Sequence, residues 1–530
     1  MNETAAPLKG VQEKEAQATV ISKKVFVSFF AERKNTLILC LVAIIATSAT
    51  CIHYLLVLLD WTVIGFNLDD SWIHLEYARS IYEGRAWEYS PGYPSTGSTS
   101  PLWSIVLSII FFFTSDPASI VWGVMIVSWI LYFLCTFTVG YFVSDLTESL
   151  LIGSVSMIVF VVIPSNTWLM LSGMEYPLFM LLLLLPLILM NNSGSQFDAA
   201  LGLVAGLAFL ARSEGILLAL IAVPIRIIQH VNARDFTRKR LVSILSMFGI
   251  AASVALPWIL YCISVTGYPL PDTFYAKVGV ISDTDVEAWN IFWTAFFGTM
   301  PFVLMGLILG VLSLLKKRPY AWLLGISMTL LYRFTMPYQA LINNSRYITP
   351  IFGFLAISCV VGFGVHACEL IKSDKRPNAR MYRVLISTLL VLLIVVPSVP
   401  LYLNQADLFG NATKNINEMQ VDIGYWVAEN TPEDSVLALG DVGATRFISN
   451  RTIIDLCGLV TPDIAHGNFT PGELVNYLET RDADYLIIFG KWHGFYNVLM
   501  GQHMTELYRV ELDDNRICGD DTMVVYEITW

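Results

Sequence analysis

The sequence predicts a polytopic α-helical membrane protein that carries a small α/β domain at its carboxyl end. Hydrophobic residues make up 55% of the 530-residue chain and charged residues only 14%, whereas soluble proteins carry roughly a quarter charged residues. Apolar runs such as 37–59 and 118–143 exceed the ~20 residues that a helix needs to cross a ~30 Å hydrocarbon core. After residue 404 the composition becomes that of a soluble domain with an excess of acidic residues.

The transmembrane domain is predicted to extend over 37–403, after a polar leader, 1–36, that we expect to be an irregular cytoplasmic tail. No small-residue cleavage site clearly follows the first apolar run, which favours an uncleaved span over a signal peptide. We expect about eleven spans by the length criterion, at approximately 37–59, 118–143, 150–171, 175–190, 198–212, 214–229, 241–263, 291–315, 320–337, 347–369 and 383–403.

The distribution of Lys and Arg orients these spans, because cytoplasmic loops carry an excess of both residues. One face receives the leader and three basic loops, 226–240, 316–319 and 372–383. This pattern requires 211–215 to be the tip of a short helical hairpin. It also requires 101–113, which is short for a span, to be an interfacial or re-entrant helix. With the leader inside, the first outer loop, 60–117, and the domain at 404–530 are extracytoplasmic.

Residues 404–530 alternate between helical and extended patterns, which is typical of an α/β domain. We expect helices near 415–430 and 471–481 and strands at 435–440, 451–455, 484–489, 506–512 and 522–528. Cys457 and Cys518 fall in this domain and could form a disulfide in an oxidising compartment. The other cysteines lie in or beside spans, where a small buried hydrophobic residue is the simpler interpretation.

Several functional classes are disfavoured. The net charge of −11 is concentrated in the outer domain and argues against a nucleic-acid partner. HExxH, CxxC and Walker-type sequences do not occur, which argues against zinc chemistry of the usual spacing and against ATP hydrolysis. A transporter or flippase is the main alternative to an enzyme, although transporters more often show inverted repeats or broken helices, and the sequence indicates neither. An adhesion or sensor protein would not need the charged residues of the first outer loop.

The first outer loop holds a dense group of ionisable residues. Residues 68–82 suit an amphipathic helix that starts at Asp69 and Asp70, with His74 four residues after Asp70 on the same face. The two acids lie about 100° apart on such a helix, so one can act as a base while the other caps the helix. A carboxylate beside a histidine at the membrane boundary is a candidate base, because desolvation raises its basicity.

Two cations lie on later outer loops at the membrane boundary. Lys277 and Arg346 could together hold one anionic group, for which phosphate is the natural candidate. For either residue alone, snorkelling to the interface explains its position as well. Three further residues are candidates for substrate binding: Arg212 and Glu214, which can also simply pair across the hairpin tip, and Glu175, which has no evident partner in the sequence.

These parts together describe a glycosyltransferase that uses a lipid-phosphate sugar, because a lipid phosphate would place its leaving group at the height of these cations. An ordered series of motifs between about residues 37 and 467 resembles the GT-C superfamily of polytopic glycosyltransferases, and within it the branch that contains the mycobacterial terminal β-(1→2) arabinofuranosyltransferase. The motifs are DDSWIHLEYARSIYEGRAWEYSPGYPSTGSTSPLW, SGMEYPLF, LARSEG, LPDTFYAK, SRYITP and DLCGLVTPDIAHG. This chain reads RSEG where such sequences tend to read RPEG, and its outer domain is compact compared with those of the mycobacterial enzymes.

The resemblance implies inverting transfer of a sugar from a polyprenyl-phosphate donor to a cell-envelope glycan or glycolipid, on the outer face of the cell membrane. Arabinofuranose is the sugar that this branch suggests. Either Asp69 or Asp70 would deprotonate the acceptor hydroxyl. The leaving group is a monophosphate, so two cations suffice without a metal, although an acidic pair can also bind a divalent ion.

The resemblance also implies a set of donor contacts. Lys277 and Arg346 would stabilise the charge that develops on the phosphate. His74 would orient the base or touch the phosphate, and Tyr275 would stack on the donor or hydrogen-bond to it.

Overall fold

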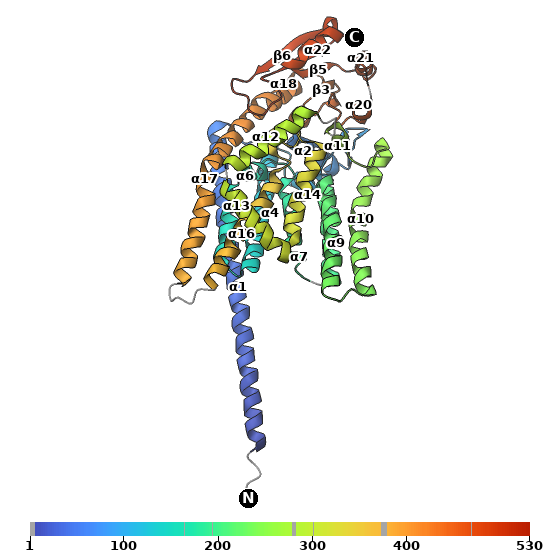
Figure 1. Ribbon diagram of the computed structural model, residues 1–530. Coiled ribbons are helices and arrows are strands. Elements are labelled where there is room, and N and C mark those ends of the chain that lie inside the picture. Colours follow the sequence, from blue (N-terminus) through green and yellow to red (C-terminus); the bar gives the residue numbers. More distant parts are fainter. Residues whose placement is uncertain are drawn as a thin grey trace.

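The structure is a computed structural model that describes residues 6–163, 165–192, 194–277, 282–299, 301–372, 379–467 and 469–530. It consists of a bundle of roughly parallel helices with a smaller domain containing a β-sheet at one end (Figure 1). The long helices of the bundle are α1 (Ala6–Trp61), α4 (Pro117–Thr147), α5 (Leu150–Val162), α7 (Tyr176–Leu189), α8 (Ser195–Ala211), α9 (Ile216–Asn232), α10 (Arg238–Thr266), α13 (Pro301–Lys317), α14 (Pro319–Thr335), α16 (Thr349–Lys372) and α17 (Ala379–Ile416).

The bundle helices expose large apolar side chains, among them Leu41 and Leu56 of α1 and Leu245 and Leu260 of α10, as expected of helices that are surrounded by hydrocarbon. Within the described residues, four segments are long and apolar enough to cross a membrane, namely 33–61, 117–147, 213–232 and 238–266, and shorter apolar helices accompany them. Each predicted span overlaps a bundle helix, and the number of about eleven crossings stays a prediction. The hairpin between α8 and α9 has its tip at 212–215, as predicted.

Three local expectations differ from the structure. The leader was expected to be irregular, but α1 is helical from Ala6 and projects beyond the bundle (Figure 1), because the segment is rich in the good helix formers Glu, Lys, Ala and Gln. The span predicted at 291–315 straddles α12 (Asp283–Thr299) and α13, whose first residue, Pro301, is favoured at a helix start. The span at 150–171 is divided into α5 and a short helix, α6 (Asn166–Met170).

The first outer loop folds over the outer end of the bundle. Its main element is α2 (Asp70–Tyr82), which matches the predicted amphipathic helix and is buried along most of its length. The small hairpin of β1 (Glu88–Ser90) and β2 (Tyr93–Pro94) follows. The segment expected to be interfacial or re-entrant forms two short helices, α3 (Pro101–Ser108) and η1 (Ile109–Phe112), which together are too short to cross a bilayer.

The outer domain has the predicted α/β architecture. Its five-stranded sheet has the order β4-β3-β5-β7-β6, in which β4, β3 and β5 are parallel and β7 and β6 are antiparallel to their neighbours. The elements are η3 (a π-helical turn, Asn417–Val421), α18 (Asp422–Asn430), β3 (Val436–Leu439), α19 (Ala444–Ser449), β4 (Thr452–Asp455), α20 (Pro462–His466), α21 (Pro471–Thr480), β5 (Tyr485–Phe489), α22 (Gly490–Met500), η4 (Gly501–His503), β6 (Met504–Glu511) and β7 (Thr522–Ile528).

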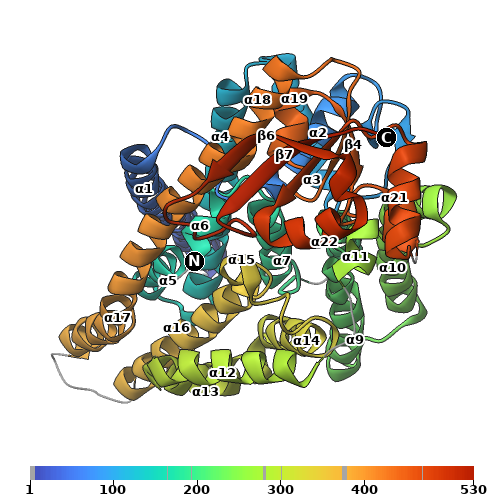
Figure 2. The same cartoon turned by 90° about the horizontal axis from the view of Figure 1, so that it is seen from above.

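The sheet joins the two parts of the molecule. Side chains alternate between the faces of a strand, so Leu437 and Leu439 pack on one face in a cluster that includes Ile73 and Tyr77 of α2. Ala438 belongs to the opposite face, which α21 and α22 cover. Helix α17 runs from the bundle through the predicted boundary at residue 404 into the outer domain without a break. The outer domain therefore lies directly over the first outer loop (Figure 2).

Candidate active site

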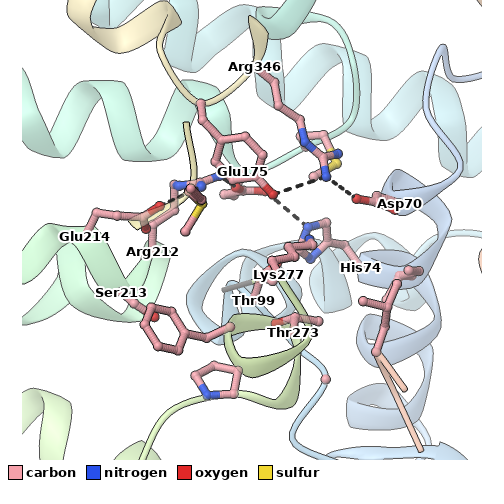
Figure 3. A pocket seen from close by; sticks show the side chains of 18 of the residues that line it. Asp70, His74, Thr99, Glu175, Arg212, Ser213, Glu214, Thr273, Lys277 and Arg346 are labelled. Atoms are coloured by element: carbon pink, nitrogen blue, oxygen red, sulfur yellow. Dashed lines mark hydrogen bonds and ion pairs between the residues drawn. The ribbon is translucent and has the colours of Figure 1, made fainter. Parts of the chain in front are cut away.

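A cavity of about 910 Å³ lies at the outer end of the bundle, beneath the outer domain (Figure 3). We call it the central cavity. Its acidic, basic and histidine lining residues come from α2, from the start of α7, from the tip between α8 and α9, from α11 (Asp272–Lys277) and from the start of α16. They are Asp70, His74, Glu175, Arg212, Glu214, Lys277 and Arg346. Segments that are far apart in the sequence thus meet around one space, as the prediction of a single site requires.

Asp70 and Arg346 form an ion pair inside the cavity, with 2.7 Å between Asp70 Oδ2 and Arg346 Nη2. The Asp70 side chain is 28% exposed and that of Arg346 only 6%. Burial raises the pKa of Asp70, but the positive charges of Arg346 and Lys277 outweigh this effect and lower the pKa to about 2. Asp70 is therefore ionised at neutral pH while this pair is intact.

The backbone before Arg346 is held in an unusual conformation. Asn343, Asn344 and Ser345 have φ angles of 49°, 58° and 59°, in the left-handed region that Asn tolerates better than most residues. The Asn344 side chain is fixed by Gln405 of α17, whose Nε2 donates to Asn344 Oδ1 at 3.1 Å. This turn places Arg346 at the outer end of α16, facing α2.

A second group of charges lines the cavity beside the first. Glu175 accepts a hydrogen bond from Arg212 and lies 3.1 Å from His74 Nε2, so it has two partners that the sequence did not reveal. Arg212 also pairs with Glu214 at 2.9 Å, as predicted for the hairpin tip, and Tyr332 donates to the same Glu214 oxygen at 3.1 Å. These contacts hold the guanidinium of Arg212 in a fixed position.

Several nitrogen atoms in the cavity have no hydrogen-bond partner among the described residues. They are Arg346 Nε and Nη1 and His74 Nδ1, all of which are buried. Lys277 also lines the cavity (Figure 3) and makes no hydrogen bond or ion pair with any described residue. A buried N–H group without a partner costs free energy, so these groups are suited to an anionic ligand that supplies the missing acceptors.

Apart from His74, the charges that line the cavity balance one another. Three carboxylates face three cations: Asp70, Glu175 and Glu214 against Arg212, Lys277 and Arg346. The cavity can therefore accept an anion more easily than a site with an excess of carboxylates could.

Helix α11 presents two faces with different surroundings. Thr273, Phe274 and Lys277 line the central cavity. Tyr275, which was predicted to contact the donor, does not line it; its ring lies 5.4 Å from that of His466 in the outer domain. Asp272 is on this second face too and lies 2.8 Å from His466. Side chains that are three or four residues apart share one face of a helix. Counted from Lys277, this spacing would have placed Phe274, and not Tyr275, on the face that lines the cavity.

Asp69 and Asp70 were predicted as alternative catalytic acids, and the structure places them in different surroundings. Asp69 does not line the central cavity. Its carboxylate accepts hydrogen bonds from the backbone N–H groups of Gly443 and Ala444, at 2.8 and 2.7 Å. Burial and the negative charge of Asp441 raise the pKa of Asp69 well above its usual range. Asp69 thus connects the first outer loop to the amino end of α19.

The described residues contain no group of three or more His, Cys, Asp or Glu side chains that could hold a metal ion. Because Asp69 and Asp70 point to different partners, they do not form the joint acidic pair that a divalent ion would use. Cys457 and Cys518 are both free thiols, so the disulfide that the sequence allowed is not formed.

Sequence reasoning did not identify all of the lining residues. Thr273, Phe274 and Tyr347 lie next to predicted site residues and line the cavity, as does Leu459 of the outer domain. Leu459 lies within the motif DLCGLVTPDIAHG. The likeness of this motif to known sequences indicated that the segment is functional, but it did not indicate which residue faces the site.

Comparisons with known proteins support the fold. A family model described as a domain of unknown function, DUF8728, matches residues 414–526, which lie within the outer domain. No curated protein matches the chain. The solved structure of ArnT from Cupriavidus metallidurans bound to undecaprenyl phosphate aligns with a TM-score of 0.56 at 13% identity, and the match covers 91% of this chain and 97% of that chain. The apo structure of the same protein aligns with a TM-score of 0.52 at the same identity and coverage.

The similarity to ArnT extends over almost the whole chain, and at this level of identity it shows a shared fold. The chain therefore shares the fold of ArnT, mostly helical and with a sheet-containing domain at its carboxyl end, and the GT-C assignment of the sequence stays a prediction.

Proposed function

We propose that this chain is a glycosyltransferase that transfers a sugar from a polyprenyl-phosphate donor to an acceptor hydroxyl. The observation that carries the proposal is the meeting of one ionised acid, Asp70, with Lys277 and Arg346 in a single cavity at the outer end of the bundle. The shared fold supports it, because one of the solved ArnT structures contains undecaprenyl phosphate.

The donor phosphate would bind between Lys277 and Arg346. Lys277 has no partner among the described residues, and two guanidinium nitrogens of Arg346 lack acceptors there. A phosphate oxygen would satisfy these groups through charge-assisted hydrogen bonds, which are about twice as strong as neutral ones. The unpaired Nδ1 of His74 would supply a further contact.

Donor binding would also prepare Asp70 to act as the base. In the free protein Arg346 holds the pKa of Asp70 at about 2, which is too low for efficient proton abstraction at neutral pH. A phosphate that draws Arg346 away weakens this pair, adds a nearby negative charge and so raises the pKa of Asp70. Asp70 would then take the proton of the acceptor hydroxyl as the oxygen attacks the anomeric carbon and the bond from that carbon to the phosphate oxygen breaks.

The net charge of the cavity would be unchanged by this reaction. A sugar phosphodiester carries one negative charge, and the departing polyprenyl phosphate gains a second one when the bond to the sugar breaks. The proton that Asp70 receives removes one negative charge from the protein at the same time. The preorganised cations then stabilise the charge that develops on the phosphate.

The other site residues would position these groups. Glu175 would orient His74 and Arg212, and Glu214 would hold Arg212 from its other side. Asp69 would anchor the loop that carries Asp70 through its hydrogen bonds to Gly443 and Ala444. Tyr275 would act through its contact with His466 by fixing α11, the helix that carries Lys277.

The finer assignments follow from the resemblance of the motifs. We propose arabinofuranose as the donor sugar and a cell-envelope glycan or glycolipid as the acceptor, with inversion at the anomeric carbon. The cavity and the domain at 404–530 would lie outside the cell membrane, in agreement with the basic loops at the opposite ends of the helices. No metal is required by this mechanism, because two cations contact the leaving phosphate.

A transfer assay distinguishes the two adjacent acids. Purified Asp70→Asn protein, supplied with radiolabelled polyprenyl-phosphate sugars and a membrane-glycan extract, should transfer sugar at least about 100-fold more slowly than wild type, since a general base contributes ~10²–10⁴-fold. Asp69→Asn protein that remains folded should retain the larger part of its activity. Wild-type rates in Asp70→Asn protein would refute the assignment of the base.

The same protein reconstituted in liposomes tests the main alternative. A flippase would move the labelled lipid between leaflets without any transfer of the sugar. If wild type formed no glycan product and the Asp70→Asn protein still moved the lipid between leaflets, the protein would be a transporter and not a glycosyltransferase.

A further inference from the structure

A second cavity, which we call the outer groove, lies on the side of the outer domain and encloses about 1080 Å³. The β1–β2 hairpin, the outer end of α10, the strand β4, the segment 460–463 and the helix α21 line it. Figure 2 shows β4, α21 and α10 on the same side of the molecule. The groove contributes no residue to the mechanism described above.

The rim of the outer groove combines aromatic rings with charged groups. The guanidinium of Arg481 lies over the rings of Tyr93 and Tyr477, at 5.4 and 5.2 Å from their centres. Asp463 accepts hydrogen bonds from Arg481 at 2.6 Å and from the Tyr477 hydroxyl at 3.0 Å. The Tyr93 side chain is 48% exposed. The flat faces and the polar groups are therefore fixed before any ligand binds.

This chemistry matches a carbohydrate. One face of a sugar ring is made of C–H groups and packs on an aromatic ring, whereas its hydroxyl groups need donors and acceptors at the edge. Tyr93 offers such a face, and Asp463 and Arg481 offer an acceptor and donors. Tyrosine gives this contact area at a low cost in side-chain entropy.

An added peptide strand fits the groove less well, although β4 is an edge strand of the sheet. The N–H of Ile453 already donates to Ser90 Oγ at 3.2 Å, and the N–H of Asp455 donates to Thr461 Oγ1 at 2.9 Å. Pairing of a new strand needs such edge groups to be free, so the observations favour a sugar.

The outer groove and the central cavity share one segment of chain. Leu459 lines the central cavity, and the next residues, from Val460 to Asp463, line the outer groove. Asp455 fixes this segment because it accepts hydrogen bonds from the N–H groups of Cys457 and Val460, both at 2.8 Å. The two cavities are therefore close to one another, because consecutive residues of one fixed segment line them.

We infer that the outer groove binds the oligosaccharide part of the acceptor, outside the cavity in which the acceptor hydroxyl reacts. This inference rests on the proposed function for the word acceptor, whereas carbohydrate binding by the groove can be measured without any transfer. The main contacts would come from Tyr93 of the first outer loop and from Arg481 of the outer domain.

The test measures the binding of soluble hexasaccharides to the full-length protein in lipid nanodiscs, by saturation-transfer NMR. The probes are arabino-, manno-, galacto- and gluco-hexaoses. We expect at least one probe to bind, with an affinity that falls at least tenfold in Tyr93→Ala and in Arg481→Ala protein. Tyr93→Phe, which retains the ring, should bind within about twofold of wild type. Tyr425→Ala is the matched control, because Tyr425 is 49% exposed on α18 and lies outside the groove.

Three results would overturn the inference. The first is that none of the four probes binds, and the second is that the Tyr93 and Arg481 variants bind as well as the control does. A valine- and threonine-rich hexapeptide that competes for the groove in place of the sugars would also overturn it. Binding of undecaprenyl phosphate, measured on the same samples, distinguishes the two proposals. If the protein binds this lipid but none of the sugars, only the proposed role of the outer groove is rejected. If it binds a sugar but not the lipid, only the proposed donor is rejected.

Discussion

At the scale of single residues, the surroundings of three acids determine their roles. Asp70 faces Arg346 inside the central cavity, Asp69 faces backbone N–H groups of the outer domain, and Asp441 follows β3 and accepts a hydrogen bond from Gln420 at 2.8 Å. Burial and the charge of Asp70 raise the pKa of Asp441 to about 6, although the hydrogen bond from Gln420 opposes this change. The three carboxylates therefore repel one another when all are ionised.

This repulsion predicts a pH dependence of stability. In the unfolded chain the pKa of an Asp is about 3.9, so the folded protein holds the Asp441 proton more strongly. The stabilisation from this proton is present below pH ~4 and is lost as the pH rises through about 6. Asp441→Asn protein should therefore have a higher Tm than wild type at pH 8 and a similar Tm at pH 4. An equal difference at both pH values would contradict the prediction, and Asp434→Asn, at an exposed position, is the control.

The sequence could predict that only one of the two adjacent acids would act, because a helix separates neighbouring side chains by about 100°. It could not predict which one, since the partners of Asp69 lie more than 370 positions later in the chain. In the same way, Glu175 showed no partner in the sequence because His74 and Arg212 reach it only in the folded protein.

At the scale of elements, α2 connects the central cavity to the outer domain. The fully buried Glu76 of α2 lies 3.0 Å from the equally buried Arg446 of α19. Arg446 also donates to the carbonyl of Tyr89 at 3.2 Å, and Arg79 donates to the carbonyl of Phe447 at 3.0 Å. Because α2 also carries Asp70 and His74, these contacts fix the position of the candidate base relative to the outer domain.

Breaking this contact should destabilise the junction strongly. Glu76→Ala leaves Arg446 buried without its partner, a change that typically costs about 3–5 kcal/mol. We expect a lower unfolding temperature and faster protease cleavage near α19 in detergent. Glu83→Ala is the matched control, because Glu83 is 42% exposed at the end of the same helix and a surface ion pair contributes about 0–1 kcal/mol. Equal stability of the two variants would show that the junction does not depend on this ion pair.

Elements with a clear pattern of apolar residues could be predicted from the sequence, whereas breaks between helices could not. The strands β3, β5 and β7 are short buried apolar runs between turn residues, and all were expected. The change from α12 to α13 interrupts an apolar run without a strong signal other than Pro301. The central cavity as a whole was predictable only through ordered motifs, because charge and hydropathy place residues at a membrane face but do not tell which side chains meet.

At the scale of the whole molecule, a helical bundle of the fold shared with ArnT carries an outer domain in which residues 414–526 match the model of a domain of unknown function, DUF8728. Helix α17 joins the two parts without a break, and the first outer loop is packed between them. The roles that we propose for the bundle, the first outer loop and the outer domain follow from this arrangement. The bundle would hold the lipid donor, the first outer loop would supply the base, and the outer domain would direct the acceptor toward both.

The most direct test of the central claim is the binding of undecaprenyl phosphate to the purified full-length protein, measured by native mass spectrometry in detergent. The account predicts that wild type binds the lipid and that Lys277→Ala and Arg346→Ala each weaken binding at least tenfold, about 1.4 kcal/mol. Lys414→Ala, at a cation outside the central cavity, should bind as wild type does. Unchanged affinity in both cavity variants would contradict the claim that these two cations and Asp70 surround one polyprenyl-phosphate head group.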